Sequence, residues 1–585
     1  MAIIFLCIGI RTGAIAAMLL SIQLMKFFLR TGWGNSTRCI GGDILKILHG
    51  LCQGNGAAPA AWLTLSSILV RVYKSLGFGL KMESPITRVM LDIMGVLYVD
   101  DTDLFIMNDF AINDLNVHDE SQAALTAWGK LLISTGGVLK PEKCFYYMVD
   151  YKWDADGFWS YEEGHEEDKL YVPLPDGSSA EIEQLPVDVS KKTLGIWTNP
   201  AGDCEKQLEV IEATIGTWTS RLEAGRLPAK WAWVSYFHQL WAKLRYGLGV
   251  NASSVEDLLG QEAEGGRLRK LYRRMIPRLG VNRNIKAGWR HLHSSFGGIG
   301  LRKLLSEVVI SRLNLFLQHY SCQSTLGQKL NISLECLQLE IGSDGCPLSE
   351  PFALLGQLAT PCWCRSFWQG LDHYDFDLHL DYPSIPHPRE GDKLLKDIFL
   401  GTNPTLSDLR SLNRCRIAWS TLFLSDITTA DGRCISQQYM RPPTDLTRIE
   451  SRYSFAEERP TLLDWKAWAN FWVDYTQAGL RIPRPLGNWL DKSHITWQWY
   501  WDADSSLLQR CHPSKIEYFL PAGMGRTRST ATYVLTSTHT DGRSHSGVPC
   551  SVETIDSNAV RLHSIGPSLC DGPPDPSKFF DFLSS

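Results

Sequence analysis

Residues 96–106 read Val96-Leu97-Tyr98-Val99-Asp100-Asp101-Thr102-Asp103-Leu104-Phe105-Ile106. Two apolar, β-prone runs flank adjacent carboxylates, which predicts a hairpin with the acids at its tip. Adjacent acids in such a setting are unfavourable unless a cation neutralises them. Magnesium does so with oxygen ligands, and two-metal sites use such carboxylates in phosphoryl transfer. An isolated Asp-Asp pair is more often an ordinary turn, so the surrounding sequence has to distinguish the two interpretations.

A glycine-rich segment stands about 45 residues upstream of the acids and reads Leu48-His49-Gly50-Leu51-Cys52-Gln53-Gly54-Asn55-Gly56-Ala57-Ala58-Pro59-Ala60-Ala61-Trp62. Residues 63–74 follow at amphipathic helical spacing. Glycines let backbone amides approach a nucleotide or template closely, and a helix after them can pack beneath a sheet. The segment is weak evidence alone but gains weight from its position before the acidic hairpin.

In this order the motifs resemble the reverse transcriptase palm of non-LTR retrotransposons. Gln53-Gly54 with Pro59 is similar to motif B, and Tyr98-Val99-Asp100-Asp101 matches the Tyr-x-Asp-Asp motif C. Three further segments are similar to motif D, to motif E and to a segment found beyond the thumb: residues 136–144, 193–196 and 296–301. The resemblance covers roughly residues 20–320 and depends on the order and spacing of the motifs.

This resemblance implies an α+β fold with a partial polymerase palm (an antiparallel sheet with packed helices) and a helical thumb. Beyond it we expect a mostly helical C-terminal region. It implies an RNA-directed DNA polymerase that adds deoxynucleotides to a primer 3′-hydroxyl. Its partners would be an RNA template, a DNA primer and deoxynucleoside triphosphates. Asp100 and Asp101 would be the catalytic ligands of Mg²⁺, with Mn²⁺ as the alternative ion. The nucleotide and template would be bound by Gln53, Gly54, Tyr98 and Lys143.

Two of these residues carry a second interpretation. Lys143 is equally well explained as a solvated turn lysine, because lysines are usually exposed. Asp103 is expected to support the hairpin rather than bind metal. Strand alternation points it to the same side as Asp101 but one residue pair further along.

The family has a further metal-binding aspartate in motif A, on a strand several tens of residues before motif B. Before Gln53 this chain has only Asp43, in a Gly-Gly-Asp sequence that predicts a loop. We therefore expect the chain to begin inside a domain, without motif A or the fingers, and two-metal catalysis to be weak or absent. The alternatives are a non-catalytic nucleic-acid-binding remnant of a retroelement polymerase and a domesticated scaffold that binds proteins.

The charge of the chain is unevenly distributed. A net charge of −5 excludes a uniformly basic nucleic-acid coat. Residues 266–306, however, contain eleven Lys and Arg and no acid, whereas residues 150–188 contain twelve Asp and Glu. The basic segment predicts a helix that follows a phosphate backbone, with a merely soluble helix as the alternative. Its expected backbone contacts are Arg267, Arg269, Lys270, Arg273, Arg274 and Arg278.

The expected division of the chain follows these features. Trp465, Trp468 and Trp472 recur at helical spacing and are expected in a core rather than in a base-stacking platform. The predicted parts are a partial palm with motifs B, C and D (1–149), an acidic β-rich insertion leading to the motif E hairpin (150–200), a basic helical thumb (201–320), a Trp-rich domain (321–537) and a poorly ordered tail (538–585).

The N-terminal apolar runs, residues 2–10 and 14–25, are each shorter than a membrane span and are separated by Arg11. Near-helical spacing from Ile15 to Phe28 predicts a buried helix, with Lys26 and Arg30 at its polar end. We therefore expect neither a signal peptide nor a membrane partner. Fifteen cysteines without framework spacing favour a reducing, intracellular compartment, with nucleus and cytoplasm both open.

Overall fold

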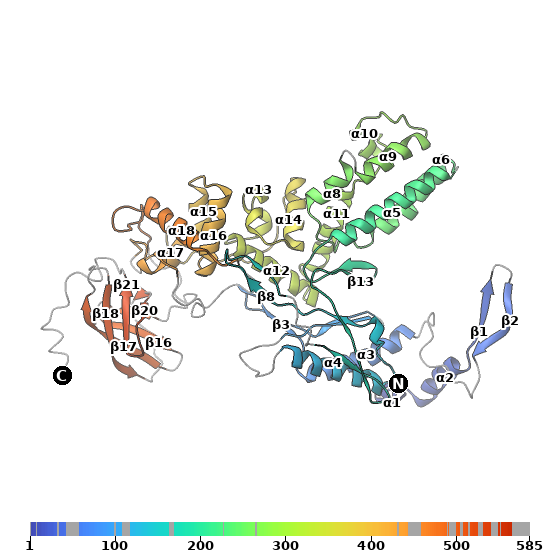
Figure 1. Ribbon diagram of the computed structural model, residues 1–585, viewed down its shortest axis with the longest axis horizontal. Coiled ribbons are helices and arrows are strands. Elements are labelled where there is room, and N and C mark those ends of the chain that lie inside the picture. The colour runs from blue at the N-terminus through green and yellow to red at the C-terminus, as the bar shows by residue number, and fades with distance from the viewer. Residues whose placement is uncertain are drawn as a thin grey trace. The chain divides into compact units, whose positions relative to one another are not determined.

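The computed structural model shows an α+β protein in which helices predominate (Figure 1). Among the described residues most strand pairings are antiparallel, and β7 with β12 is a parallel pair. The chain divides into two compact units. Unit 1 consists of Met1–Met82, Met90–Val149 and Glu163–Val189, and unit 2 consists of Glu83–Val89, Asp150–Glu162 and Ser190–Ser585. The residues that the structure describes are 2–7, 9–31, 34–41, 58–98, 101–107, 117–162, 169–225, 227–263, 266–429, 432–442, 458–487, 490, 499–502, 507–512, 515–524, 530–539, 548–549 and 552–563.

Unit 1 is built from short strands and two longer helices. Its helices are α1 (Ala2–Cys7), α2 (Thr12–Gln23), α3 (Ala58–Ser75), α4 (Val117–Ser134) and the single turn η1 (Pro141–Lys143). Its strands are β1 (Lys26–Thr31), β2 (Gly34–Gly41), β3 (Leu80–Glu83), β4 (Met90–Ile93), β5 (Gly95–Tyr98), β6 (Asp101–Leu104), β7 (Phe145–Tyr146), β10 (Tyr171–Pro173), β11 (Ser179–Glu181) and β12 (Glu183–Gln184). A core of Leu69, Tyr73, Met94, Ala124 and Trp128 joins α3 and α4.

The N-terminal segment differs from the expected buried helix. Helix α2 ends at Gln23, and Lys26–Thr31 forms strand β1, which pairs with β2 as a hairpin. The expectation is wrong because Phe27 and Phe28 suit a strand as well as a helix, and pairing with β2 satisfies their backbone groups. Within α2, Ile15 is buried, but most of the described side chains are exposed. In the described residues, no helix has the length and apolar character needed to cross a membrane.

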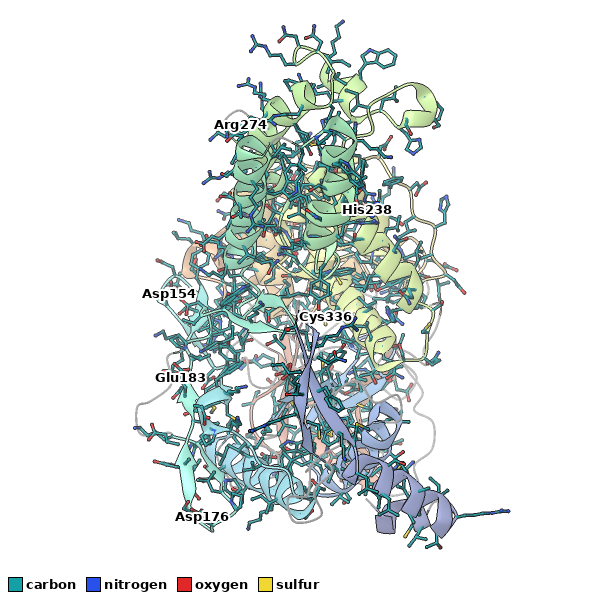
Figure 2. All side chains as sticks on the ribbon, turned by 90° about the vertical axis from the view of Figure 1, so that its right-hand side faces the viewer. Asp154, Asp176, Glu183, His238, Arg274 and Cys336 are labelled. Carbon is teal, nitrogen blue, oxygen red and sulfur yellow. The ribbon has the colours of Figure 1, made fainter. Side chains whose placement is uncertain are left out.

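The acidic segment forms the predicted hairpins, but they are split between the units. Figure 2 labels Asp154 in the turn between β8 (Tyr151–Trp153) and β9 (Trp159–Tyr161), and Asp176 in the β10–β11 turn. The first hairpin belongs to unit 2 and the second to unit 1. Each hairpin makes contacts within its own unit. The guanidinium of Arg459 lies 3.8 Å from the ring of Trp153, whereas Gln122 of α4 donates to the carbonyl of Tyr171. One acidic module over residues 150–200 is therefore not seen.

The first half of unit 2 is helical, as expected for residues 201–320. Two strands precede the helices, β13 (Lys191–Thr193) and β14 (Ile196–Thr198). The helices are α5 (Glu205–Ala224), α6 (Ala229–Ser235), η2 (Tyr236–Leu240), α7 (Trp241–Arg245), α8 (Val255–Glu262), α9 (Arg267–Arg278), α10 (Ala287–His291), η3 (Ser294–Phe296) and α11 (Leu304–His319). Their apolar faces form one core around Tyr236, Trp241, Leu271 and Met275.

A second helical layer follows in the chain: α12 (Thr325–Ile341), η4 (Pro347–Ser349), α13 (Phe352–Leu355), η5 (Gly356–Leu358), α14 (Trp363–His373), α15 (Leu395–Leu400), α16 (Leu406–Ala418), α17 (Leu424–Ile427), η6 (Gln437–Met440) and α18 (Leu462–Tyr475). In α18, Trp465, Trp468 and Trp472 are all buried against α15 and α16. The prediction that this tryptophan stripe is core is confirmed.

From residue 321 onward helices predominate in the described residues, as expected, but after α18 the chain forms strands. Its strands are β15 (Trp499–Asp502), β16 (Leu507–His512), β17 (Lys515–Met524), β18 (Thr530–His539), β19 (Val548–Pro549), β20 (Val552–Thr554) and β21 (Ala559–His563). They form a seven-stranded sheet in the order β19-β15-β16-β17-β18-β21-β20. The described residues after 538 therefore belong to a sheet rather than to a poorly ordered tail. Residues 564–585 lie outside the described residues.

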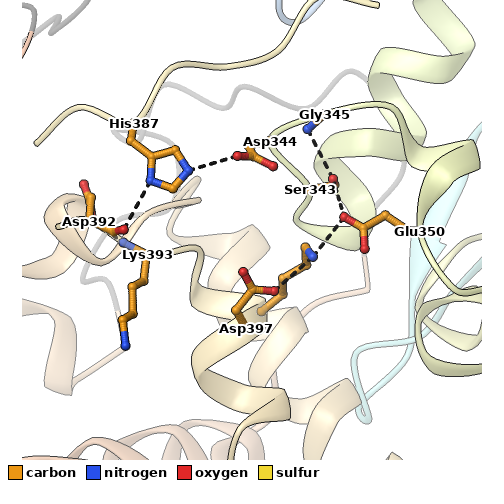
Figure 3. A network of polar contacts seen from close by, with 9 residues as sticks. Ser343, Asp344, Gly345, Glu350, His387, Asp392, Lys393 and Asp397 are labelled. Atoms are coloured by element: carbon orange, nitrogen blue, oxygen red, sulfur yellow. Dashed lines mark hydrogen bonds and ion pairs between the residues drawn. The ribbon is translucent and has the colours of Figure 1, made fainter. Parts of the chain in front are cut away.

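Polar contacts, with Lys396 the most buried group among them, fasten the loop after α12 to the segment around α15 (Figure 3). The His387 ring bridges two groups. Its Nε2 lies 2.9 Å from the Asp344 carboxylate, and its Nδ1 lies 3.2 Å from the Asp392 carbonyl oxygen. Lys396 Nζ lies 2.9 Å from Glu350 and 3.0 Å from Asp397. Burial alone would lower the pKa of Lys396, but these two carboxylates outweigh it and raise the pKa. The network accounts for a nearly buried charge without invoking a catalytic role.

Glu340 near the end of α12 makes the stability of unit 2 dependent on pH. Burial raises the pKa of its carboxyl to about 7, against partial opposition from hydrogen bonds donated by Thr360. Because the folded chain binds this proton more tightly than the unfolded chain, its stabilising effect is complete below about pH 4.5 and is lost as the pH rises through 7. The loss at pH 8 is roughly 3 kcal/mol at most.

We expect Glu340→Gln to be more stable than the parent chain at pH 8 and about equally stable at pH 4.5, because glutamine still accepts from Thr360 without ionising. Urea denaturation followed by circular dichroism at both pH values measures this. Glu209→Gln is the control, since Glu209 is exposed on α5. Parallel pH dependences of the parent chain and Glu340→Gln would contradict the assignment.

Candidate functional site

The predicted acidic hairpin is present. Strands β5 and β6 are antiparallel with Gly95 opposite Leu104, Val96 opposite Asp103, Leu97 opposite Thr102 and Tyr98 opposite Asp101. The two connecting residues, Val99 and Asp100, lie outside the described residues. The motif B residues Gln53 and Gly54 also lie outside them, as does Asp43. Of the expected site, the structure therefore brings together Tyr98 and Asp101 as direct neighbours across the hairpin.

The hairpin has an apolar face and an open face. Leu97 and Leu104 pack against the core that α3 and α4 form. On the opposite face Val96, Tyr98, Asp101 and Asp103 are exposed, and Tyr98 is 61% exposed. Strict alternation along both strands produces this separation. The two carboxylates therefore lie on the side of the hairpin that a ligand can reach.

Gly95 sets how closely the two strands approach at the base of the hairpin. A Cβ at this position would lie 2.2 Å from the carbonyl oxygen of Asp103, closer than any side chain allows. The ladder continues one residue further, where the amide of Phe105 donates to the carbonyl of Met94 at 3.0 Å. Sequence reasoning missed this residue, although a glycine before an apolar strand is a known signal for close backbone approach.

Asp103 lies on the open face with Asp101, one residue pair further along the hairpin, as strand alternation predicted. Partial burial, and then repulsion from Asp101, raise the pKa of its carboxyl. Among the described residues, neither carboxylate is paired with a lysine or arginine. Residues two apart on a strand lie about 7 Å apart on the same face, which accounts for the repulsion between the two carboxylates. Uncompensated oxygen donors of this kind fit Mg²⁺ or Mn²⁺, which prefer carboxylate ligands.

Lys143 lies at the end of η1 and is exposed. Leu139, four residues earlier, packs on the same core as Leu97 and Leu104, so the lysine segment and the hairpin share one support. Within the described part of the chain, Lys143 makes no ion pair. The structure is consistent with either interpretation of this residue, a phosphate contact or a solvated turn.

The segment that resembles motif E forms a hairpin, β13–β14, as expected. Its two turn residues, Leu194 and Gly195, have φ values of 52° and 89°, which suit a tight type I′ turn. The hydroxyl of Tyr246 donates to the carbonyl of Leu194, and Gln207 Oε1 accepts from the amide of Trp197 at 3.0 Å. The hairpin is therefore held by the helices of unit 2.

Helix α9 has the apolar stripe that its spacing predicted. Leu268, Leu271, Tyr272 and Met275 are buried, and Leu279 follows directly after the helix, 9% exposed. The six basic residues occupy the remaining surface: Arg267, Lys270, Arg273 and Arg274 are exposed, and Arg269 and Arg278 are half-buried. Figure 2 shows Arg274 pointing outward from α9.

The basic side chains of α9 are not equivalent. Arg278 donates to the carbonyls of Gly225 at 2.8 Å and Glu223 at 3.0 Å, so it caps the C-terminal end of α5. Arg274 and Arg267 pair with acids of α5, Glu223 at 2.6 Å and Glu212 at 3.6 Å. Lys270, by contrast, makes no ion pair or side-chain hydrogen bond with a described residue. Spacing alone could not separate these roles, because the partners lie more than 45 residues away.

Comparisons with protein-family models, with curated proteins and with solved structures find no match to this chain.

Proposed function

We propose that the chain is an RNA-directed DNA polymerase of the retroelement type, with Mg²⁺ at the open face of the β5–β6 hairpin. The observation that carries the proposal is the pairing of Tyr98 with Asp101 on a hairpin whose other face packs on α3 and α4. This arrangement of an acidic hairpin above two helices is the one that the resemblance to a polymerase palm implies. The sequence Tyr98-Val99-Asp100-Asp101 adds the residue types that such a site needs.

Each residue has a defined part in the proposed reaction. Asp101, together with Asp100, would hold the metal, which supplies positive charge to the reacting phosphate. The primer 3′-hydroxyl would give its proton to water, its oxygen would form a bond to the α-phosphorus, and the bond from that phosphorus to the pyrophosphate leaving group would break. Tyr98, exposed beside Asp101, would contact the nucleotide and the primer end. The Lys143 ammonium would offset the negative charge that develops on pyrophosphate.

A non-catalytic nucleic-acid-binding remnant is the second candidate. It is favoured by one observation, the exposed basic residues on α9, which can bind a phosphate backbone without a metal. Primer extension by the purified chain on an RNA template with Mg²⁺ distinguishes the two. Extension supports the polymerase, template binding without extension supports the remnant, and absence of both would leave the protein-binding scaffold.

The basic residues of α9 provide a separate prediction about binding. We expect Lys270→Gln to weaken template binding and to lower the slope of log affinity against log salt concentration by about 1, because one phosphate contact is lost. Arg278→Gln should leave that slope nearly unchanged and instead lower thermal stability, because it removes the cap on α5. Binding titrations at several salt concentrations measure both variants. If Lys270→Gln and Arg278→Gln changed the salt slope equally, the two residues would not have the separate roles of phosphate contact and helix cap.

A further inference from the structure

Residues 281–303, here called the tip segment, follow α9 at one end of the helical bundle (Figure 1). The segment carries two large aromatic side chains in contact with solvent: Trp289 is 50% exposed and Phe296 is 73% exposed. Gly297, which follows Phe296 directly, lies beside the Trp289 ring. A Cβ built at Gly297 would be 3.9 Å from that ring. In the described residues, neither ring stacks on another aromatic ring. Both aromatic side chains are thus accessible to an outside partner.

The tip segment is a rigid support for these rings. The amides of Ile299, Gly300 and Leu301 donate to the carbonyls of Trp289, Leu292 and Arg290 at 2.8–2.9 Å. Arg290 Nε donates to the carbonyl of Ile285 at 2.8 Å. Such a network holds the aromatic residues in place without covering them. Little ordering entropy is then lost when a ligand binds.

Gly298 shows how tightly the segment is folded. A Cβ at this position would lie 2.0 Å from the carbonyl oxygen of Leu292, so a side chain would push the backbone apart. The same residue accounts for part of the Gly-Gly-Ile-Gly sequence. The exposed rings therefore lie on a backbone whose conformation is specified by its own sequence.

The charge around the rings selects a class of partner. Arg283, Lys286 and Lys303 are exposed and form no ion pair with a described residue. The nearest following acid, Glu307, is already paired with Arg302 at 2.9 Å and Arg245 at 3.1 Å. A surface of open aromatic faces and uncompensated cations is complementary to a polyanion that carries flat, unpaired bases. A duplex hides those base faces, whereas a single strand presents them.

We propose that the tip segment binds single-stranded nucleic acid, with unpaired bases stacking on Trp289 and Phe296 while Arg283, Lys286 and Lys303 contact phosphates. This inference rests on the proposed function in one respect: a polymerase of this type handles a single-stranded template, which is the ligand proposed for the tip segment. It adds a binding surface apart from the hairpin and from the basic face of α9. The chemistry applies equally to RNA and DNA single strands.

The test measures binding of the full chain to a fluorescent pyrimidine oligonucleotide by anisotropy, without metal or nucleoside triphosphates. We expect the double variant Trp289→Ala/Phe296→Ala to bind the strand about tenfold more weakly or worse, from the loss of base stacking. A strand of abasic sugar phosphates should bind parent and variant alike. The conservative Trp289→Tyr/Phe296→Tyr variant should keep most of the affinity. Trp231→Ala is the matched control, because Trp231 on α6 is 54% exposed.

Three results would overturn the proposal: no binding of a single strand by the parent chain, unchanged binding by the alanine double variant, or an equal loss for Trp231→Ala. An equal loss on the abasic strand would also overturn it, since it would assign the rings no contact with bases. Failure of primer extension alone leaves the outcome of this binding test unaffected. The polymerase proposal and the tip proposal can therefore fail independently.

Discussion

Replacing Asp101 with Asn is expected to lower RNA-templated primer extension about a hundredfold or more, because asparagine cannot supply the negative charge that a metal ligand provides. Asp101 is exposed on the open face of the hairpin, so the substitution should leave the packing of Leu97 and Leu104 against α3 and α4 unchanged. Extension rates at saturating Mg²⁺, together with template affinity measured separately, test this result. Affinity should change much less than rate.

Asp92→Asn is the matched control for this variant. Asp92 lies on β4 of the same unit and is exposed, but the open face of the hairpin does not include it. Its substitution should leave extension nearly unchanged. If Asp101→Asn and Asp92→Asn retain the same activity as the parent chain, the hairpin is not the catalytic site. Restored extension by Asp101→Asn in Mn²⁺, an ion that tolerates weaker ligand sets, would instead strengthen the assignment.

Arg416→Met is expected to destabilise unit 2 by about 4 kcal/mol, the largest stability effect that the structure suggests. The Arg416 guanidinium is fully buried. It donates to the carbonyls of Leu339 and Glu340, each at 2.8 Å, and thereby closes the C-terminal end of α12. Methionine fills a similar volume but removes all the hydrogen bonds of the guanidinium, including those to Asn413 Oδ1 and to the Thr421 carbonyl. Each hydrogen bond from a charged donor contributes about 1.5–3 kcal/mol.

Arg410→Met provides the comparison, because Arg410 lies on the same helix, α16, but is exposed and reaches Gln357 only at 3.4 Å. Its loss should change stability by less than about 0.5 kcal/mol. Urea denaturation followed by tryptophan fluorescence measures both variants, since Trp468 and Trp472 are buried in the adjoining core. Equal midpoints for the two variants would contradict the capping role of Arg416. Arg416→Lys should also lose stability, since an ammonium cannot reproduce the planar fork of donors.

The parts of the fold that were predicted correctly have strong local periodicity. The β5–β6 hairpin follows from two apolar runs around the acids, and the α9 stripe from apolar residues three and four apart. The tryptophans of α18 were likewise assigned to a core by their helical spacing. In each case a residue's neighbours along the chain are also its neighbours in space, so spacing alone carried the information.

The failures have a different physical origin. Residues 548–563 are rich in turn-forming residue types, which favoured a poorly ordered tail, yet their strands complete the C-terminal sheet. Strand β19 pairs with β15, almost fifty residues earlier, and β21 pairs with β18. Such long-range pairing stabilises strands whose local propensity is weak. The strands after residue 538 were not expected, because their partners cannot be recognised from local sequence.

Local sequence alone established the acidic hairpin, its alternating carboxylates and the basic stripe of α9, because side-chain direction follows directly from strand and helix periods. Tertiary contacts decided which of these groups are open to a ligand. Packing on α3 and α4 leaves Asp101 and Asp103 exposed, and the carbonyls of Glu223 and Gly225 engage Arg278 while Lys270 stays exposed. Whether each of these side chains is exposed or engaged depends on residues tens of positions away in the chain, and the spacing of neighbouring residues does not encode such contacts.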